Sequence, residues 1–149
     1  MAQKTAARRR HRQQCAALPL MEQDGETRVM LVTSRDTGRW VLPKGWVERR
    51  VSPHEMAARE AFEEAGIIGA VEAEPLGAYA YPKRLGRGAP VTCKVAVFQM
   101  RVEKLLDDWP ERRERVRRWF TLRQAAGAVK EPDLGALLLR LADHPTPTA

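Results

Sequence analysis

The sequence predicts an α/β fold of the α+β type, a sandwich in which a mixed β-sheet lies between helices. Short runs rich in β-branched and aromatic residues both precede and follow one central helical pattern. Two further helical patterns come after the last of these runs. No internal repeat or linker divides the 149 residues. We therefore expect one domain at residues 12–142, a basic, disordered arm at 1–11 and a frayed tail at 143–149.

The part of the chain before the central helix is expected to hold three strands, at residues 13–20, 27–33 and 40–44. Asp24 and Gly25 form a turn signal between the first two. Pro19 cannot donate a ladder hydrogen bond, so it favours a sheet edge or a strand end for the first strand. The third strand delivers Lys44 and Gly45 to the segment before the helix.

The central helix is predicted at residues 53–65 from the signals at its two ends. Ser52 is a good N-cap, and Glu55 three residues later completes a capping-box pattern. Pro53 suits the first helical position, and Gly66 is a C-terminal stop.

This helix is expected to have one acidic face. At about 100° per residue one arc holds the charged residues Arg59, Glu60, Glu63 and Glu64. The opposite arc holds Ala57, Ala58, Ala61, Phe62 and Ala65. Glutamates at i,i+3 and i,i+4 repel one another at about 0.2–0.5 kcal/mol each. A bound Mg²⁺ or Mn²⁺ would turn this repulsion into binding, whereas the alternative is a solvated acidic surface.

The chain after the helix is expected to supply the remaining strands and two helices. Strand-like runs lie on either side of Pro75 within residues 68–81, and at 91–102 and 115–120. A glycine-rich basic loop at 82–90 joins a hairpin, and residues 104–113 are expected to be irregular. Thr121 and Gln124 form a second capping-box pattern before helices at 122–130 and 134–142.

The composition favours an anionic partner. Lys and Arg number 26 against 19 Asp and Glu, a net charge of +7. Because the helix face is acidic, the positive excess lies elsewhere and attracts polyphosphates, phosphorylated small molecules or nucleic acid, unless it serves solubility alone. No apolar run is long enough to span a membrane and no signal segment opens the chain, so we expect a cytoplasmic protein without a membrane partner. Cys15 and Cys93 are expected to be reduced core residues.

The stretch from Gly45 to Ile67 resembles the Nudix box, G-x5-E-x7-R-E-U-x-E-E-x-G-U, in which U is aliphatic. The residues in register are Gly45, Arg59, Glu60, Ala61, Glu63, Glu64, Gly66 and Ile67. The resemblance implies that Glu60, Glu63 and Glu64 bind the metal with the carbonyl of Gly45, while Arg59 orients them. It also implies a mixed sheet flanked by helices.

The first glutamate of the box is replaced by Val51. In the family this glutamate supports the helix by pairing with the arginine. Two outcomes are open: Glu48 or Glu55 takes over as the partner of Arg59, or Arg59 relies on Glu63 alone and the site is looser. We favour the first.

Other segments resemble the branch of the family that acts on diphosphoinositol polyphosphates and diadenosine polyphosphates. They are HRQQCAAL, LVTSRDTGRWVLPKG and DDWPERRERVRRWF. Lys44-Gly45-Trp46 replaces a triple glycine, and the first strand is less basic than in that branch. The resemblance implies metal-dependent hydrolysis of a pyrophosphate linkage in a nucleoside diphosphate-linked compound.

Candidate site residues outside the box come from this resemblance and from the basic loops of the chain. Many members add a metal-binding acid before the final Trp-Phe strand, which falls here on Glu114, with Glu111 as second choice. Expected substrate contacts are Arg12, Ser34, Arg35, Arg39, Lys44, Lys83, Arg84 and Arg87. Trp46 stacks on a base or supports its loop. The sequence does not apportion the roles of ligand and general base among Glu60, Glu63 and Glu64, and it does not give the oligomeric state.

Two alternatives remain open at this stage. Removal of 5′ pyrophosphate from RNA is favoured by the basic N-terminus and the pI of about 10.0. A catalytically weak Nudix-fold nucleotide-binding regulator is favoured by Val51 alone.

Overall fold

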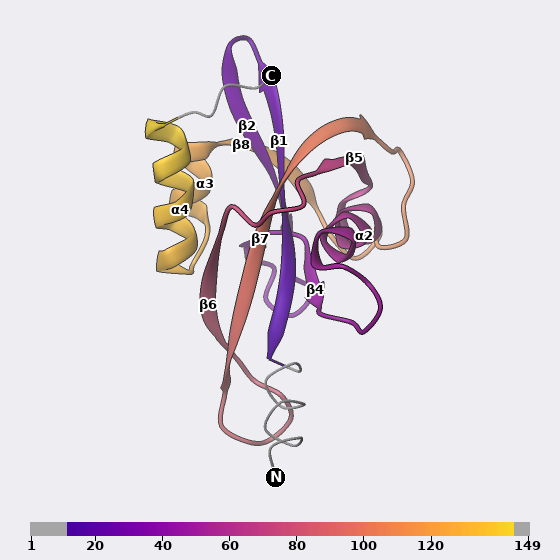
Figure 1. The fold of residues 1–149 in the computed structure, drawn as a ribbon, viewed down its shortest axis with the longest axis vertical. Coiled ribbons are helices and arrows are strands. Elements are labelled where there is room, and N and C mark those ends of the chain that lie inside the picture. Colours follow the sequence, from indigo (N-terminus) through magenta and orange to yellow (C-terminus); the bar gives the residue numbers. More distant parts are fainter. Residues whose placement is uncertain (1–11, 145–149) are drawn as a thin grey trace.

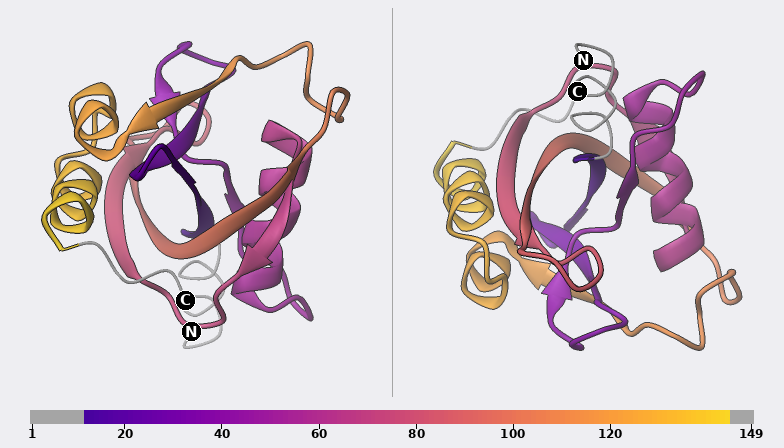
Figure 2. Two further views of the ribbon diagram at one scale, coloured as in Figure 1. Left: turned by 90° about the horizontal axis from the view of Figure 1, so that it is seen from above. Right: turned by 90° about the horizontal axis from the view of Figure 1, so that it is seen from below.

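The computed structural model describes residues 12–144, in which one mixed sheet separates a single helix from a pair of helices (Figure 1). The strands are β1 (Gln13–Gln23), β2 (Glu26–Thr33), β3 (Trp40–Val41), β4 (Lys44–Trp46), β5 (Ile67–Val71), β6 (Gly77–Lys83), β7 (Val91–Leu105) and β8 (Arg117–Thr121). The helices are α2 (Pro53–Ala65), α3 (Leu122–Ala128) and α4 (Pro132–Asp143). This is the α/β sandwich that the sequence predicts. The two views in Figure 2 show a strongly curved sheet with α2 on one side and α3 and α4 on the other.

Strand β1 lies at the centre of the sheet, in the order β3-β2-β1-β7-β5. It runs parallel to β7, from Gln13 opposite Lys94 to Leu20 opposite Arg101, and the other strand pairs are antiparallel. The expectation that Pro19 marks an edge or an end is therefore wrong. On its other side β1 pairs with β4 up to Ala16 and with β2 from Leu20 onward, so the proline falls between two partners.

The alternation of side chains along β1 divides the core into two layers. Cys15 and Ala17 pack in the layer that includes the buried face of α2. Ala16 and Leu18 pack in the layer that α3 and α4 cover. All four are fully buried, as expected for a central strand with both faces covered.

The ends of α2 agree with the sequence in part. Pro53 opens the helix, and Gly66 closes it in the left-handed conformation with φ +66°. The capping box predicted at Ser52 and Glu55 is wrong, because the Ser52 hydroxyl makes no cap hydrogen bond. Its oxygen has no partner within residues 12–144.

The faces of α2 also differ from the helical wheel. Phe62, predicted on the buried arc, is 40% exposed, whereas the carboxylate residue Glu64 is only 3% exposed. The helix is rotated so that Glu64 points toward β4, where it meets the backbone N–H of Lys44. Glu64 is thus buried against β4, whereas Glu60 and Glu63 on the same face remain partly exposed.

The C-terminal part follows the prediction more closely. Thr121 and Gln124 form the expected reciprocal capping box at the start of α3. Strand β7 continues through Lys104 and Leu105, which the sequence assigned to an irregular segment, because these residues pair with β5. Both cysteines are free and buried, as predicted. No helix in residues 12–144 is long and apolar enough to cross a membrane.

Candidate active site

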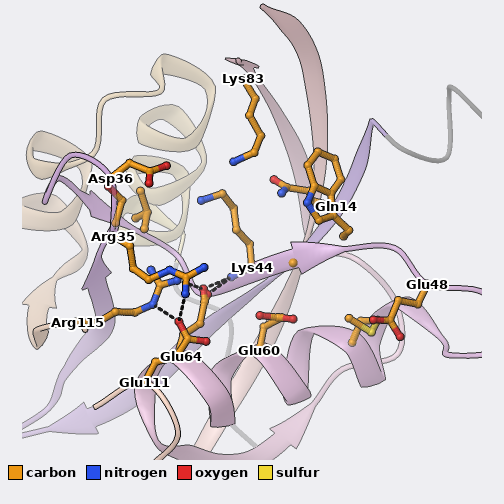
Figure 3. Close-up of a pocket in the computed structure, with 15 residues that line it drawn as sticks. Gln14, Arg35, Asp36, Lys44, Glu48, Glu60, Glu64, Lys83, Glu111 and Arg115 are labelled. Atoms are coloured by element: carbon orange, nitrogen blue, oxygen red, sulfur yellow. Dashed lines mark hydrogen bonds and ion pairs between the residues drawn. The ribbon is translucent and has the colours of Figure 1, made fainter. Parts of the chain in front are cut away.

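A pocket of about 330 Å³ opens where β4 meets the acidic face of α2 (Figure 3). Glu60 and Glu64 project into it from α2. Lys44 and Lys83 approach from the opposite side, on β4 and β6. The cavity thus has an acidic wall and a basic wall, built from parts of the chain that are far apart in sequence.

Gly45 lets the acidic wall come close to β4. A Cβ atom at this position would lie 2.3 Å from Oε1 of Glu60, inside any acceptable contact. A larger residue at position 45 would therefore push the Glu60 side chain away from the strand. The approach brings the backbone of Gly45 beside Glu60, consistent with the glycine's place in the expected ligand set.

Glu64 is fixed by several partners despite its burial. Its Oε2 accepts a hydrogen bond from the backbone N–H of Lys44 at 3.3 Å, and its Oε1 lies 3.4 Å from the guanidinium of Arg115. Burial raises the pKa of Glu64 to about 7, and Arg115 and Lys44 oppose this rise. The carboxylate is therefore held rigidly at the base of the pocket.

Of the carboxyl groups that line the pocket, Glu60 has the most strongly raised pKa. Burial raises the pKa of Glu60 to about 8, and repulsion from Glu64, Glu63 and Glu111 adds to the rise. The protonated form is thereby favoured at neutral pH. A nearby cation would relieve both the burial cost and the repulsion.

Arg115 links Glu64 and Glu111 at this end of the pocket. Its Nε donates to Glu111 at 2.8 Å, and its Nη1 donates to the carbonyl of Thr33 at 3.1 Å. Its side chain is 10% exposed. Sequence reasoning missed this residue, because it stands in an arginine-rich run whose members look alike, and only the fold shows which one turns inward.

Lys44 is the half-buried cation of the basic wall. Burial lowers the pKa of Lys44 to about 8, while the charge of Glu64 acts in the opposite direction. Its ammonium lies 5.4 Å from the centroid of the Tyr81 ring, a cation–π distance that stabilises the charge where few waters reach it.

The family model of the NUDIX domain matches residues 10–140. The chain belongs to the Nudix family.

Individual Nudix relatives agree at modest identity. Nudix hydrolase 12, mitochondrial, of Arabidopsis thaliana is 37% identical over 100 residues, which cover 65% of this chain and 49% of the relative. Diphosphoinositol polyphosphate phosphohydrolase 2 of Rattus norvegicus is 33% identical over 113 residues, 74% of this chain and 59% of the relative. This chain spans about half the length of the curated relatives that it matches.

A solved structure shows the same fold. The crystal structure of C. elegans Ap4A hydrolase has a TM-score of 0.65 and 19% identity, and the alignment covers 90% of this chain and 98% of that one. At this identity the likeness concerns the fold alone. It agrees with the curved mixed sheet and flanking helices described above.

About half of the site residues expected from the sequence line this pocket. Those that line it are Ser34, Arg35, Lys44, Gly45, Glu60, Glu64 and Lys83. Those that do not are Arg12, Arg39, Arg59, Glu63, Arg84, Arg87 and Glu114. Arg39 instead pairs with the buried Glu131, and Arg84 reaches the carbonyl of Gly88 within its own loop.

The acid supplied by the segment before β8 is Glu111. It lines the pocket, whereas Glu114 is half-exposed and pairs with Arg35 at 3.5 Å. This reverses the order expected from the sequence. The backbone explains the reversal, since the N–H of Glu111 donates to the carbonyl of Glu63 at 3.0 Å and ties this residue to α2.

Arg59 has the substitute partner that the sequence predicts. Its guanidinium lies 3.2 Å from Oε2 of Glu48. Glu48 therefore takes the place of the first box glutamate, whose position is occupied here by Val51. Val51 itself packs against the apolar layer beneath α2. The altered Nudix box therefore keeps an acidic partner for its arginine.

The donor set fits a hard divalent cation only in part. Glu60 and Glu64 supply carboxylate oxygens beside Gly45, and the raised pKa of Glu60 marks a place where positive charge is needed. Within residues 12–144, however, no three acidic, histidine or cysteine side chains converge closely enough to enclose a metal ion. Mg²⁺ commonly takes one or two carboxylates and completes its shell with water and substrate phosphates, so Glu60 and Glu64 are compatible with it.

Proposed function

We propose that this chain hydrolyses a pyrophosphate linkage in a nucleoside diphosphate-linked or similar polyphosphate compound, with Mg²⁺ or Mn²⁺ as cofactor. The observation that carries the proposal is the single cavity with carboxylates on one wall and amines on the other. Neither wall alone would be specific, but a metal-bound polyphosphate needs both kinds of group.

The chemistry follows from the charges. A phosphate anhydride resists attack by water because its phosphoryl groups are anionic. A divalent cation held by Glu60, Glu64 and the Gly45 carbonyl would neutralise part of that charge. Lys44, Lys83 and Arg35 would orient the phosphate chain by ion pairing.

The attacking water must lose a proton. A carboxylate of the acidic wall must accept it, and Glu60 qualifies only once a bound cation has lowered the raised pKa that keeps it protonated near neutral pH. Arg115 holds Glu111 and Glu64 in place beside it.

We propose diadenosine polyphosphates or diphosphoinositol polyphosphates as the substrates. Cations lie on more than one side of the pocket, which suits a phosphate chain longer than one pyrophosphate. The names of two similar proteins, a diphosphoinositol polyphosphate phosphohydrolase and an Ap4A hydrolase, support these classes.

A substrate panel tests the proposal. Diadenosine tetra-, penta- and hexaphosphate, a diphosphoinositol polyphosphate, a nucleotide sugar and a 5′-triphosphate RNA are compared with Mg²⁺ and with Mn²⁺, and the products are identified by mass. Glu64→Gln is the inactive reference, and the exposed Glu72→Gln is its matched control. We expect a polyphosphate to be cleaved fastest. A nucleotide sugar that is cleaved about tenfold faster than every polyphosphate would overturn the substrate assignment.

RNA is the second candidate, and the net charge of +7 is the observation in its favour. Binding that weakens steeply with added salt, together with release of pyrophosphate from the RNA, would favour it. A regulator without turnover has lost its main support, because the Arg59–Glu48 contact compensates for Val51.

A further inference from the structure

The basic wall of the pocket contains a recess on the side of β4 that faces away from α2. Gln14 of β1 is directly opposite Trp46 of β4, so the two side chains leave the same face of the sheet. Lys44 is two residues before Trp46 and shares this face. Lys83 of β6 completes the recess (Figure 3), and we call these four residues the Gln14 recess.

The two amines of the Gln14 recess rest on aromatic rings. The ammonium of Lys44 lies 5.4 Å from the centroid of Tyr81, and that of Lys83 lies 5.9 Å from the centroid of Trp46. Within residues 12–144 neither ammonium takes part in an ion pair. Both charges therefore remain available to an anion. One face of each ring, Tyr81 and Trp46, is already covered by an ammonium group.

The amide of Gln14 has a fixed orientation. Its Oε1 accepts a hydrogen bond from the Tyr81 hydroxyl at 2.6 Å, and the residue is only 4% exposed. Gln14 lines the pocket. With its oxygen engaged, the amide has its Nε2 group left as a donor, and no hydrogen bond within the described residues uses that group.

We propose that Gln14 is a specificity-determining residue, and that the Gln14 recess binds a phosphoryl group of the substrate beyond the two joined by the cleaved bond. The recess offers two ammonium groups and one amide N–H group, all of them donors. A phosphate, which only accepts, satisfies them all. A nucleobase would need to displace Lys83 from Trp46 before it could stack there.

The inference rests on the proposed function, because it names a feature of the same substrate. Tyr81 is a positioning residue, since it acts through the amide of Gln14. A substrate with only two phosphates leaves the recess unfilled, so the recess selects for longer chains. The neutral amide contributes direction without adding a third positive charge.

Binding without turnover tests this inference. Inorganic tripolyphosphate and orthophosphate are titrated into the protein in excess chelator, by calorimetry. We compare Gln14→Glu and the uncharged Gln14→Leu with Gln13→Glu, which makes the same change at the exposed neighbouring residue of β1. Thermal unfolding checks that each variant is folded. We expect both Gln14 variants to bind tripolyphosphate at least about tenfold more weakly and Gln13→Glu to match the wild type.

Kinetics on the panel substrate that is cleaved fastest give a second readout. Gln14→Leu and Tyr81→Phe should raise KM by about threefold to tenfold with little change in kcat, as loss of uniform binding predicts. Wild-type affinity in a folded Gln14→Leu would overturn the inference. So would adenosine, which has no phosphate, if it displaced tripolyphosphate.

Failure of the two proposals can be told apart. Tripolyphosphate binding that depends on Gln14, without hydrolysis of any panel compound, would refute the proposed function and support the recess. Hydrolysis with unaltered KM in the Gln14 variants would support the function and refute the recess.

Discussion

The guanidinium group of Arg117 lies over the indole ring of Trp109, 4.0 Å from its centroid. The same group donates to the carbonyl of Ala65 at 2.8 Å, and the Trp109 indole N–H donates to the carbonyl of Glu64 at 3.0 Å. The C-terminal end of α2 is thus tied to the segment that carries Glu111. Two parts of the pocket wall are held together by this stacked pair.

Replacing Arg117 by Met should destabilise the protein. The carbonyls of Ala65, Gly66 and Leu106 would lose a donor, and unpaired buried groups cost about 1–3 kcal/mol each. We expect the free energy of unfolding in urea to fall by about 3 kcal/mol. The exposed Arg113→Met should change it by less than about 0.5 kcal/mol. Equal unfolding midpoints for both variants would show that the stacked pair is dispensable.

Activity should depend on a divalent cation and on Glu64. Excess chelator should abolish hydrolysis, and Glu64→Gln should lower kcat by at least about 10², the range of key electrostatic groups. Steady-state kinetics with Mg²⁺ measure both effects. Full turnover in chelator would remove the cation from the mechanism, and a wild-type rate for Glu64→Gln would move the site elsewhere.

Glu111 should matter more than Glu114. Glu111 lines the pocket beside Arg115, whereas Glu114 is half-exposed on the surface. Glu111→Gln should therefore lower kcat by about tenfold or more, while Glu114→Gln should stay within about twofold of the wild type. These matched substitutions differ only in position. The reverse order of effects would restore the ranking that the sequence favours.

Restoring the glutamate at position 51 should change little. Glu48 already pairs with Arg59 at 3.2 Å, although both side chains are about half-exposed. Val51→Glu should therefore leave activity at low Mg²⁺ within about twofold, and Glu48→Gln should reduce it. The double variant should recover the loss. A large gain from Val51→Glu alone would mean that Glu48 supports Arg59 poorly.

The raised pKa of Glu60 should appear in the way stability depends on pH. Its pKa is raised from 4.5 to about 8, first by burial, so the folded protein binds this proton more tightly than the unfolded chain. The stabilisation is complete below pH 4.5 and is lost as the pH rises through about 8. In chelator, Glu60→Gln should therefore become more stable than the wild type as the pH rises.

The expected gain is modest because Glu60 is partly exposed. Allowing for solvent screening, we expect about 1 kcal/mol near pH 8.5, or an increase in Tm of about 2–4 °C. The difference should shrink toward about pH 5, where the unfolded chain also begins to bind the proton. Scanning calorimetry of both proteins measures it. A difference in Tm between the two proteins that stays constant from about pH 5 to about pH 8.5 would contradict the raised pKa of Glu60.

Local signals predicted the elements that depend on local contacts. Pro53 and Gly66 set the ends of α2, and Thr121 with Gln124 set the start of α3. These residues act within one turn of chain, so their effect can be read from spacing. The pairing of Arg59 with Glu48 was also predicted, because the two residues are close in sequence.

Features that depend on the tertiary fold could not be read from spacing. Glu111 and Glu114 are equally plausible in sequence, and only the turn before β8 brings Glu111 inward. Arg39 looked like a phosphate contact, yet it pairs with Glu131, the residue just before α4 and far away in sequence. Pro19 suggested an edge or a strand end, yet it lies in the central strand, where the change of partner from β4 to β2 leaves a gap beside it.

The parallel pairing of β1 with β7 also bears on when the pocket can form. Gln13 pairs with Lys94, so a long loop must close before β1 is fixed on that side, and such closure is slow and entropically costly. Helix α2 depends on nearby residues and can form earlier. A chain emerging from the ribosome would thus carry its acidic helix before Lys83, β7 and Arg115 arrive. Until then those carboxylates would face water without their counter-charges, and no polyphosphate could be held against them.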